Sequence, residues 1–263
     1  MITDTLFSVV DKVVLVSGAS RGIGRALAHG FAARDAQVII SSRDPASLAK
    51  TAQEISSGKH PVTSVACDVS KDADVASLAD AVVRAHGRID TLVNVAGMNI
   101  RKRAETYTPA EYDQIIDTNL RGLFMLAQAV GKQMIKQGAG TIVNVDSLNT
   151  YAPLKGVTPY AISKAGVVMM TRALALEWGA YGIRVNTIAP GFFPTELAKK
   201  VWAQPKMQAW GRENTPLQRL GEVDELVGAA IFLASQASSF VTGHCLRVDG
   251  GVSAGMNWPI ELP

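Results

Sequence analysis

A short apolar run followed by closely spaced glycines constrains this chain more than any other feature. Residues 13–16 are three valines and one leucine, as expected for a strand covered on both faces in a parallel sheet. Gly18, Gly22 and Gly24 then allow a tight turn, and apolar residues at helical spacing follow. A glycine-rich turn between a strand and a helix N-terminus is typical of an anion site, here for the pyrophosphate of a dinucleotide.

Strand and helix patterns alternate along the rest of the chain. Strands are predicted at residues 13–16, 37–41, 62–67, 91–95, 141–145, 184–189 and 245–248, with two long helices at 109–137 and 159–180. The chain has 263 residues, 48% of them hydrophobic, which is enough for one large core. Repeated β-α units predict a doubly wound α/β fold, with a seven-stranded parallel sheet and helices on both faces, in a single domain over residues 1–263.

Residues 191–221 interrupt this alternation. The segment carries several prolines together with Phe192, Phe193, Trp202 and Trp210. Because it is long and follows a predicted strand end, where ligands bind in such folds, we expect it to be a substrate lid. The alternative is a surface excursion that contains a short helix.

Composition argues against several classes of function. The net charge of +3, without a basic stripe of interleaved aromatic residues, does not indicate a nucleic-acid partner. No apolar run approaches the ~20 residues of a membrane span. The four histidines are scattered and show no metal-ligand spacing. Cys67 and Cys245 lie in apolar runs and no signal peptide is evident, so we expect a reduced, cytoplasmic protein without a metal.

The end of the second predicted strand indicates which dinucleotide binds. NAD-binding folds usually carry an acidic residue there, and NADP-binding folds a basic residue near the extra phosphate. Here Ser42 and Arg43 end the strand, and Arg21 lies inside the glycine-rich turn. Two arginines directed at one phosphate form strong charge-assisted hydrogen bonds. These residues predict NADP(H) in preference to NAD(H), although Asp44 would favour NAD if its carboxylate faced the ribose.

Tyr160 and Lys164 form a candidate acid–base pair. They are four residues apart on a predicted helix, so they share one face. A free phenol, with a pKa near ~10, is a weak base at neutral pH, and a nearby ammonium lowers that pKa. Ser147 follows the fifth predicted strand, where its hydroxyl can polarise a carbonyl oxygen. This combination predicts proton transfer to or from the oxygen of a ketone or alcohol.

The chain resembles the short-chain dehydrogenases/reductases over nearly its whole length. The matching positions are residues 18–24, 68–69, 94–97, 190–191 and 248–251, with Asn119, Ser147, Tyr160, Lys164 and Thr195. The resemblance implies a Rossmann-type fold, usually in a homotetramer. It also implies an enzyme that transfers hydride between a nicotinamide and an alcohol or ketone.

The resemblance implies a role for each matching residue. Tyr160 would be the general acid/base, and Lys164 would lower its pKa and hold the nicotinamide ribose. Ser147 would orient the substrate oxygen, and Asn119 would fix a water that relays protons towards Lys164. With the glycine-rich turn, the predicted cofactor site comprises Gly18, Ser20, Arg21, Gly22, Ile23, Gly24, Ser42, Arg43, Asp68, Val69, Asn94, Ala96, Gly97, Lys164, Pro190, Gly191, Phe193 and Thr195.

Two positions depart from the family's pattern. Val95 stands where the family usually has a second asparagine, and we expect little more than altered packing. Asp146 precedes the predicted catalytic Ser147, at a position where small residues are common. Its carboxylate either raises the pKa of a neighbouring acid or points away into a polar network, and both interpretations stay open.

Local sequences around Tyr160 and in residues 189–196 and 240–244 resemble gluconate 5-dehydrogenases within the family. This implies a sugar-acid substrate, with Arg101 near its carboxylate and with Lys102 and Arg103 solvated. The candidate substrate residues are Met98, Arg101, Asn149, Phe192 and Trp202. The aromatic residues of 191–221 suit a bulky ketone equally well. A broad carbonyl reductase, a 3-oxoacyl-carrier-protein reductase and a non-catalytic dinucleotide sensor are therefore the alternatives.

The two long predicted helices carry more apolar residues than one sheet contact covers. Met125, Ala129, Val168, Met169 and Leu176 are candidates for a contact between subunits, in agreement with the implied homotetramer. The apolar C-terminal residues 251–263 are expected to reach the active site of a neighbouring subunit.

Overall fold

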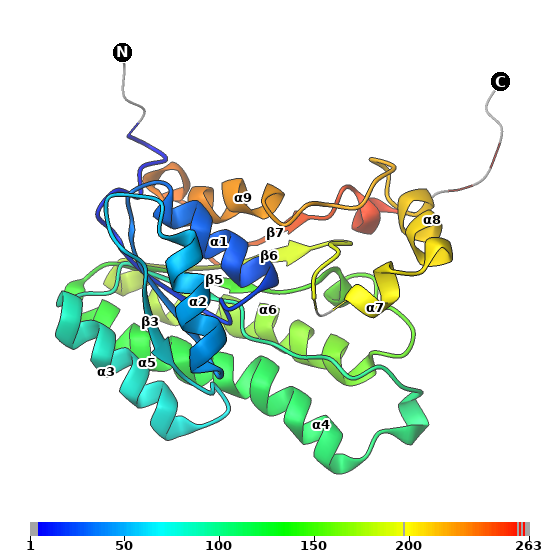
Figure 1. Ribbon diagram of the computed structural model, residues 1–263, viewed down its shortest axis with the longest axis horizontal. Helices are drawn as coiled ribbons and strands as arrows, with labels where there is room; N and C mark the ends of the chain where they lie inside the picture. Colours follow the sequence, from blue (N-terminus) through cyan, green and yellow to red (C-terminus); the bar gives the residue numbers. More distant parts are fainter. Residues whose placement is uncertain (1–4, 197, 257, 259, 261–263) are drawn as a thin grey trace.

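The sheet is formed by seven strands that all run parallel. The computed structural model describes residues 5–196, 198–256, 258 and 260 (Figure 1). The strands are β1 (Val13–Ser17), β2 (Gln37–Ser42), β3 (Thr63–Ala66), β4 (Thr91–Asn94), β5 (Gly140–Val145), β6 (Ile183–Pro190) and β7 (Cys245–Val248). Their order is β3-β2-β1-β4-β5-β6-β7. The predicted doubly wound parallel sheet is confirmed, and the compared strand and helix ends differ by one or two residues outside the interruption described below.

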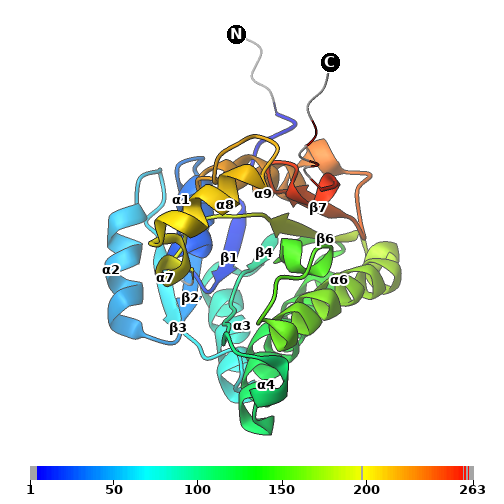
Figure 2. The same ribbon diagram turned by 90° about the vertical axis from the view of Figure 1, so that its right-hand side faces the viewer.

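Helices cover both faces of this sheet (Figures 1 and 2). One layer consists of α1 (Gly22–Ala32), α2 (Pro45–Ile55) and α9 (Glu225–Ala234), and the other of α3 (Asp72–His86), α5 (Gly122–Gln137) and α6 (Thr158–Trp178). Side chains alternate along β1: Val14 and Val16 belong to the first core, whereas Val13 and Leu15 belong to the second. Each strand therefore needs apolar residues at successive positions, because both of its faces are buried.

The helix predicted over residues 109–137 is interrupted. It consists of α4 (Pro109–Ile116), a π-helical turn (Asp117–Arg121) and α5. Gly122 follows the turn, and a Cβ there would lie 2.5 Å from the Val69 carbonyl oxygen, so the backbones approach each other closely. Apolar periodicity does not reveal one extra residue in a turn, which is why the sequence predicted a continuous helix. Such turns occur frequently at functional sites, and this one contains Asn119.

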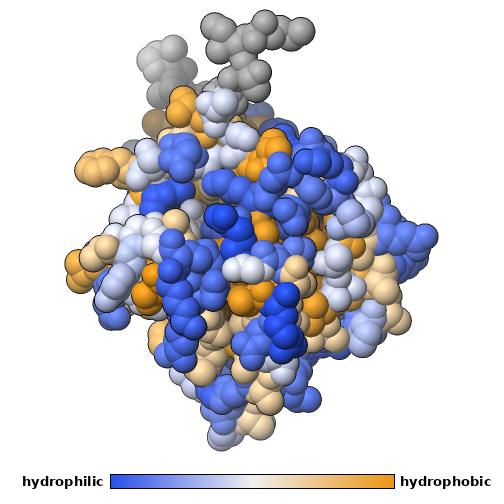
Figure 3. Space-filling view, turned by 90° about the vertical axis from the view of Figure 1, so that its left-hand side faces the viewer, coloured by the Kyte–Doolittle hydropathy of each residue, from blue (hydrophilic) through white to orange (hydrophobic). Residues whose placement is uncertain are grey.

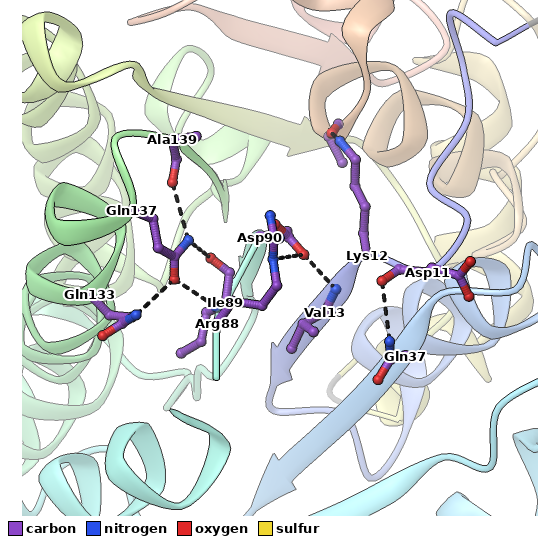
Figure 4. Close-up of polar contacts among 11 residues, drawn as sticks. Asp11, Lys12, Val13, Gln37, Arg88, Ile89, Asp90, Gln133, Gln137 and Ala139 are labelled. Carbon is purple, nitrogen blue, oxygen red and sulfur yellow. Dashed lines mark hydrogen bonds and ion pairs between the residues drawn. The ribbon is translucent and has the colours of Figure 1, made fainter. Parts of the chain in front are cut away.

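Side chains bind backbone groups at the amino edge of the sheet (Figure 4). Asp90 Oδ2 accepts a hydrogen bond from the Val13 N–H at 2.8 Å. The Gln137 amide donates to the Ile89 carbonyl at 2.9 Å and accepts from the Ile89 N–H at 3.0 Å. Lys12 Nζ donates to the last carbonyl of α9 at 3.1 Å, where a cation complements the helix dipole. Hydrophilic residues cover much of the surface on this side (Figure 3).

A row of polar residues crosses the sheet near its other, carboxyl edge. Consecutive partners in the strand register are Ser41, Ser17, Asn94, Asn144 and Thr187, from β2, β1, β4, β5 and β6. Each of these residues is at most 1% exposed. Ser17 Oγ donates to Asn94 Oδ1 at 3.0 Å and accepts from the next backbone N–H after Asn94 at 3.1 Å. Ser17 thereby ties the end of β1 to the loop after β4, whereas Ser41 Oγ and Asn144 Oδ1 have no hydrogen-bond partner among the described residues.

None of the helices in the described part of the chain is both long and apolar enough to cross a membrane. The expectation for the C-terminal segment lies partly outside the described residues, which near that end are 251–256, 258 and 260.

Candidate active site

A cavity of about 680 Å³ lies at the carboxyl ends of the strands. It extends from the glycine-rich turn after β1 to two short helices, α7 (Lys199–Trp202) and α8 (Pro205–Glu213). Both helices lie in front of this edge of the sheet in Figure 2. The predicted site residues that line the cavity are Gly18, Ser20, Arg21, Gly22, Ile23, Gly24, Ser42, Arg43, Asp68, Val69, Ala96, Gly97, Arg101, Ser147, Asn149, Tyr160, Lys164, Pro190, Gly191, Phe192, Phe193, Thr195 and Trp202.

The glycine-rich turn has the geometry that a dinucleotide requires. Gly18 has a φ of +67°, and a Cβ there would lie 2.7 Å from the backbone of Ala96. A Cβ at Gly24 would collide with the Gly18 carbonyl oxygen. No side chain caps the N-terminus of α1, so its first N–H groups remain available to an anion. The residues present therefore fit a bound pyrophosphate.

Beside the end of β2, the Asp44 carboxylate is engaged as a helix cap. It accepts hydrogen bonds from the backbone N–H groups of Ala46 and Ser47, at 3.2 and 3.3 Å, at the start of α2. A hydrogen bond from the Ser47 hydroxyl, together with these backbone contacts, holds the pKa of Asp44 below its usual value. Arg21 and Arg43 are exposed and line the cavity, and neither pairs with a carboxylate of the described residues.

Ser147, Tyr160 and Lys164 meet at the carboxyl edge. Ser147 lies two residues after the end of β5, which is Val145. Tyr160 and Lys164 lie in the first two turns of α6. Ser147 acts on the Tyr160 phenol and lowers its pKa. Lys164 is 3% exposed, and its Nζ donates to the Val145 carbonyl at 2.7 Å. Burial lowers the pKa of Lys164 to about 8, against the opposing charge of Asp146.

Several groups act on the Tyr160 phenol. Burial raises its pKa, the Ser147 hydrogen bond lowers it, the charge of Asp146 raises it and the charge of Arg101 lowers it, with a net rise. We expected Lys164 to be the cation that lowers this pKa. Its Nζ lies 5.8 Å from the centre of the Tyr160 ring, so that expectation stays a prediction, and the positive charge of Arg101 lowers the pKa of the phenol.

Asn119 lies behind the cavity and ties two segments together. Its Oδ1 accepts from the Met98 N–H at 2.7 Å, and its Nδ2 donates to the Met98 carbonyl at 2.9 Å and to Ser163 Oγ at 3.1 Å. Neither Asn119 nor Met98 lines the cavity. A Cβ at Gly97 would lie 3.5 Å from Asn119 Oδ1 and 3.8 Å from Lys164 Nζ, so this loop packs directly over both side chains.

Asn94 is also set back from the cavity. It is completely buried, and besides its bond with Ser17 its Nδ2 donates to the Leu123 carbonyl at 2.9 Å. Its side chain joins β4 to α5. Val95, the departure from the family pattern, packs partly buried against the core beneath α1 and α9.

Asp146 participates in a polar network directly beneath the reacting groups. Its Oδ1 accepts from Thr150 Oγ1 at 2.8 Å, and Cys245 Sγ lies 3.9 Å from its Oδ2. Burial raises the pKa of Asp146 to about 6. Its negative charge also raises the pKa of Tyr160 and Lys164. Asp146 thus lies in a polar network and also lines the cavity, and its charge raises the pKa of the neighbouring Tyr160.

Two cations line the cavity near the loops that follow β4 and β5. Arg101 and Lys155 both line the cavity, and neither pairs with a carboxylate among the described residues. Lys102 instead binds Glu111 at 2.8 Å, as expected for a residue outside the site. The sequence analysis missed Lys155 and the half-buried Asn99, whose Oδ1 has no hydrogen-bond partner among described residues. Both lie in loops that follow β4 and β5, which is a signal that sequence can supply.

Aromatic residues also line the cavity. The ring centres of Phe192 and Trp202 are 5.3 Å apart, as are those of Phe192 and Trp210. Leu148, from the loop after Ser147, joins Phe192 and Trp202 in a small separate core. Residues 191–221 thus contain two short helices and supply an apolar surface to the cavity.

The fold and this cavity agree with the comparison with known families. Residues 18–253 match the family model described as enoyl-(acyl carrier protein) reductase. The chain belongs to the short-chain dehydrogenase/reductase family. It is an oxidoreductase that acts on alcohol or ketone groups.

Several relatives resemble the chain over almost its whole length. It is 38% identical over 251 residues to gluconate 5-dehydrogenase of Gluconobacter oxydans (strain 621H), covering 95% of this chain and 98% of that protein. It is 39% identical over 245 residues to D-threitol dehydrogenase of Mycolicibacterium smegmatis, covering 93% and 94%. A solved gluconate 5-dehydrogenase from Burkholderia cenocepacia, in complex with NADP and tartrate, has a TM-score of 0.92 and 36% identity, covering 96% of this chain and 99% of that one.

Proposed function

We propose that the protein interconverts a ketone and a secondary alcohol with NADP(H), and that Tyr160 is its general acid/base. The observation that carries this proposal is the meeting of Ser147, Tyr160 and Lys164 beside a glycine cradle at one edge of the sheet. A bound nicotinamide supplies or accepts the hydride.

Ser147 and Tyr160 bind the substrate oxygen and transfer the proton to or from it. Ser147 Oγ accepts hydrogen bonds from the backbone and side-chain N–H groups of Asn149, at 3.2 and 3.1 Å, which leaves its own hydrogen to donate. That hydrogen can bind the substrate oxygen and polarise the carbonyl. Tyr160 then gives its proton to the same oxygen during reduction and takes it back during oxidation.

The preference for NADP(H) rests on the end of β2. Asp44 is engaged in capping α2, whereas Arg21 and Arg43 are unpaired and face the cavity. A relative with bound NADP supports the same choice. We expect kcat/KM for NADPH to exceed that for NADH, and Arg43→Ala to reduce this ratio about tenfold. Arg25→Ala is the control, since Arg25 pairs with Glu54 at 3.0 Å. A wild-type preference for NADH would overturn this assignment.

The proposed substrate is a sugar acid of the gluconate class. Arg101 and Lys155 offer positive charge to a carboxylate, and relatives that act on gluconate support this choice. The aromatic surface of Phe192, Trp202 and Trp210 favours a second candidate, a carbonyl reductase for bulky apolar ketones.

A substrate panel separates the two candidates. We expect oxidation of NADPH, followed at 340 nm, to be faster with 5-keto-gluconate than with an uncharged aryl ketone. The reverse order would support the second candidate. Cofactor binding without turnover of any ketone would contradict the enzyme assignment and favour a dinucleotide sensor.

We further propose that residues 191–221 act as a substrate lid over the domain of residues 1–263, and that the protein is a homotetramer. Met169 and Leu176 are 59% and 86% exposed on α6, which is unusual for apolar side chains unless a partner covers them. Native mass measurement tests the assembly, and a monomer would contradict it.

A further inference from the structure

Directly behind the reacting groups, the structure contains a buried carboxylate that the proposed chemistry does not use. Asp146 is 2% exposed and lies between β5, which ends at Val145, and Ser147. Its backbone N–H donates to the Ile188 carbonyl at 2.7 Å, so the residue is fixed against β6. Thr150 fixes its Oδ1 at 2.8 Å. The side chain is therefore held in one place.

The Lys164 ammonium lies next to the peptide unit that leads into Asp146. Its Nζ donates to the Val145 carbonyl at 2.7 Å, and both the ammonium and the carboxylate are almost completely buried. The two charged groups form no direct ion pair, so they interact through space. The attraction between two opposite charges is stronger in a buried environment than in water, because the dielectric constant there is lower.

The charged and titratable groups around Asp146 come from several elements. The neighbouring groups are Tyr160 and Lys164 on α6, Tyr151 after the loop turn 148–150, and Cys245 on β7. Two arginines act on these neighbouring groups. The charge of Arg101 lowers the pKa of Tyr160, and the Arg247 guanidinium lies 5.4 Å from the centre of the Tyr151 ring. Asp146 is the only carboxylate that acts on either Tyr160 or Lys164 among the described residues.

We propose that Asp146 is a positioning residue for the proton: as the buried counter-charge of Lys164 and Tyr160, it keeps the pair protonated and favours ketone reduction over alcohol oxidation. This inference rests on the proposed function, in which Tyr160 transfers the proton. The reason is electrostatic, because a negative charge stabilises the ammonium and destabilises the phenolate. Reduction needs the protonated phenol, whereas oxidation needs the phenolate.

The test is the pH dependence of both directions in Asp146→Asn. Removing the negative charge lowers the pKa values of Tyr160 and Lys164. We therefore expect the rate of ketone reduction to fall at a pH that is lower than in the wild type by about half to one pH unit, on the alkaline side of its pH profile. On the acid side of the pH profile for alcohol oxidation, the rise in rate should shift to lower pH by the same amount. Asp146→Ser, with a small neutral side chain, is a second variant in case the first does not fold, and we expect the same shift.

Thr150→Val is the matched control. It removes the hydrogen bond from Thr150 to Asp146 but keeps the carboxylate, so the high-pH limb of its reduction profile stays at the wild-type position. If Asp146→Asn and Asp146→Ser reduce kcat but leave both limbs in place, Asp146 has only a structural role and the inference is overturned. A shift to higher pH overturns it as well. Tyr160→Phe separates this failure from that of the proposed function: if that variant is inactive while Asp146→Asn shows no shift, only the role of Asp146 is wrong.

Discussion

The two edges of the same sheet are built for different purposes. At the amino edge, Asp90 and Gln137 bind backbone groups, with Thr91 Oγ1 as an exception that has no partner. At the carboxyl edge, Ser42 Oγ and Asn99 Oδ1 have no partner among described residues, and arginines stand unpaired around a cavity. Buried polar groups that lack partners reduce stability, so the difference indicates that one edge stabilises the fold and the other binds and reacts.

The largest expected effect is at the carboxyl edge. Tyr160→Phe removes only the hydroxyl that transfers the proton, so we expect kcat to fall about 100- to 10,000-fold. The melting temperature and the dissociation constant for NADPH should change little. Turnover and thermal unfolding measure the two effects.

Tyr112→Phe is the control for this change, because Tyr112 is exposed on α4. Wild-type turnover in a folded Tyr160→Phe that still binds NADPH would show that the carboxyl edge does not carry the chemistry.

The second prediction concerns the free energy of unfolding that is lost because the Asp146 carboxylate is buried at the carboxyl edge. Burial raises the pKa of Asp146 from 3.8 to about 6, so the folded protein binds this proton more tightly than the unfolded chain. That contribution is present at low pH and is lost as pH rises from about 4 to about 6, by up to ~3 kcal/mol. Relative to wild type, Asp146→Asn should therefore gain unfolding free energy across this window.

Chemical denaturation of both proteins at pH 4, 5, 6 and 7 measures the difference. A constant difference across these pH values would contradict the burial of a charged carboxylate at this edge.

The third prediction addresses the amino edge. Gln137→Leu leaves the Ile89 N–H and carbonyl without their side-chain partner, which we expect to cost about 2 kcal/mol of unfolding free energy. KM and kcat should stay near wild type in the folded protein. Gln133→Leu is the control, since it removes one hydrogen bond between side chains, at 3.1 Å, and should cost less. A changed KM in Gln137→Leu would show that the two edges are coupled.

The smallest expected effect concerns the substrate end. Arg101→Gln should raise KM for a carboxylate substrate about tenfold and leave an uncharged ketone unaffected. Because Arg101 lowers the pKa of Tyr160, the alkaline limb of reduction should also move to higher pH. Arg103→Gln is the control. The Arg103 side chain is exposed, and its Nε lies 3.7 Å from Glu105 Oε1. An equal loss with both substrates would mean that Arg101 does not contact the carboxylate.

Most elements were predictable from local pattern, and the predicted part of the cavity lining came partly from local pattern and partly from the family resemblance. Glycine spacing predicted the turn at Gly18, and the spacing of Tyr160 and Lys164 predicted a shared helix face. The π-helical turn was missed because one extra residue does not alter the apolar pattern. Lys155 was missed because, although its loop follows a predicted strand, no motif distinguishes it from the other residues of that loop.

What the sequence determined by itself is the order of strands and helices and the identity of the reactive side chains, since both depend on neighbours in the chain. Only the tertiary structure decided which of them face the cavity. Asn94 was expected at the cofactor and Asn119 at a proton relay, yet neither lines the cavity. Asn94 binds the Leu123 carbonyl on α5, and Asn119 binds the backbone of Met98. Asp146 shows both: its partner Thr150 lies only four residues along the chain, whereas Lys164 on α6 comes near it only in the folded protein.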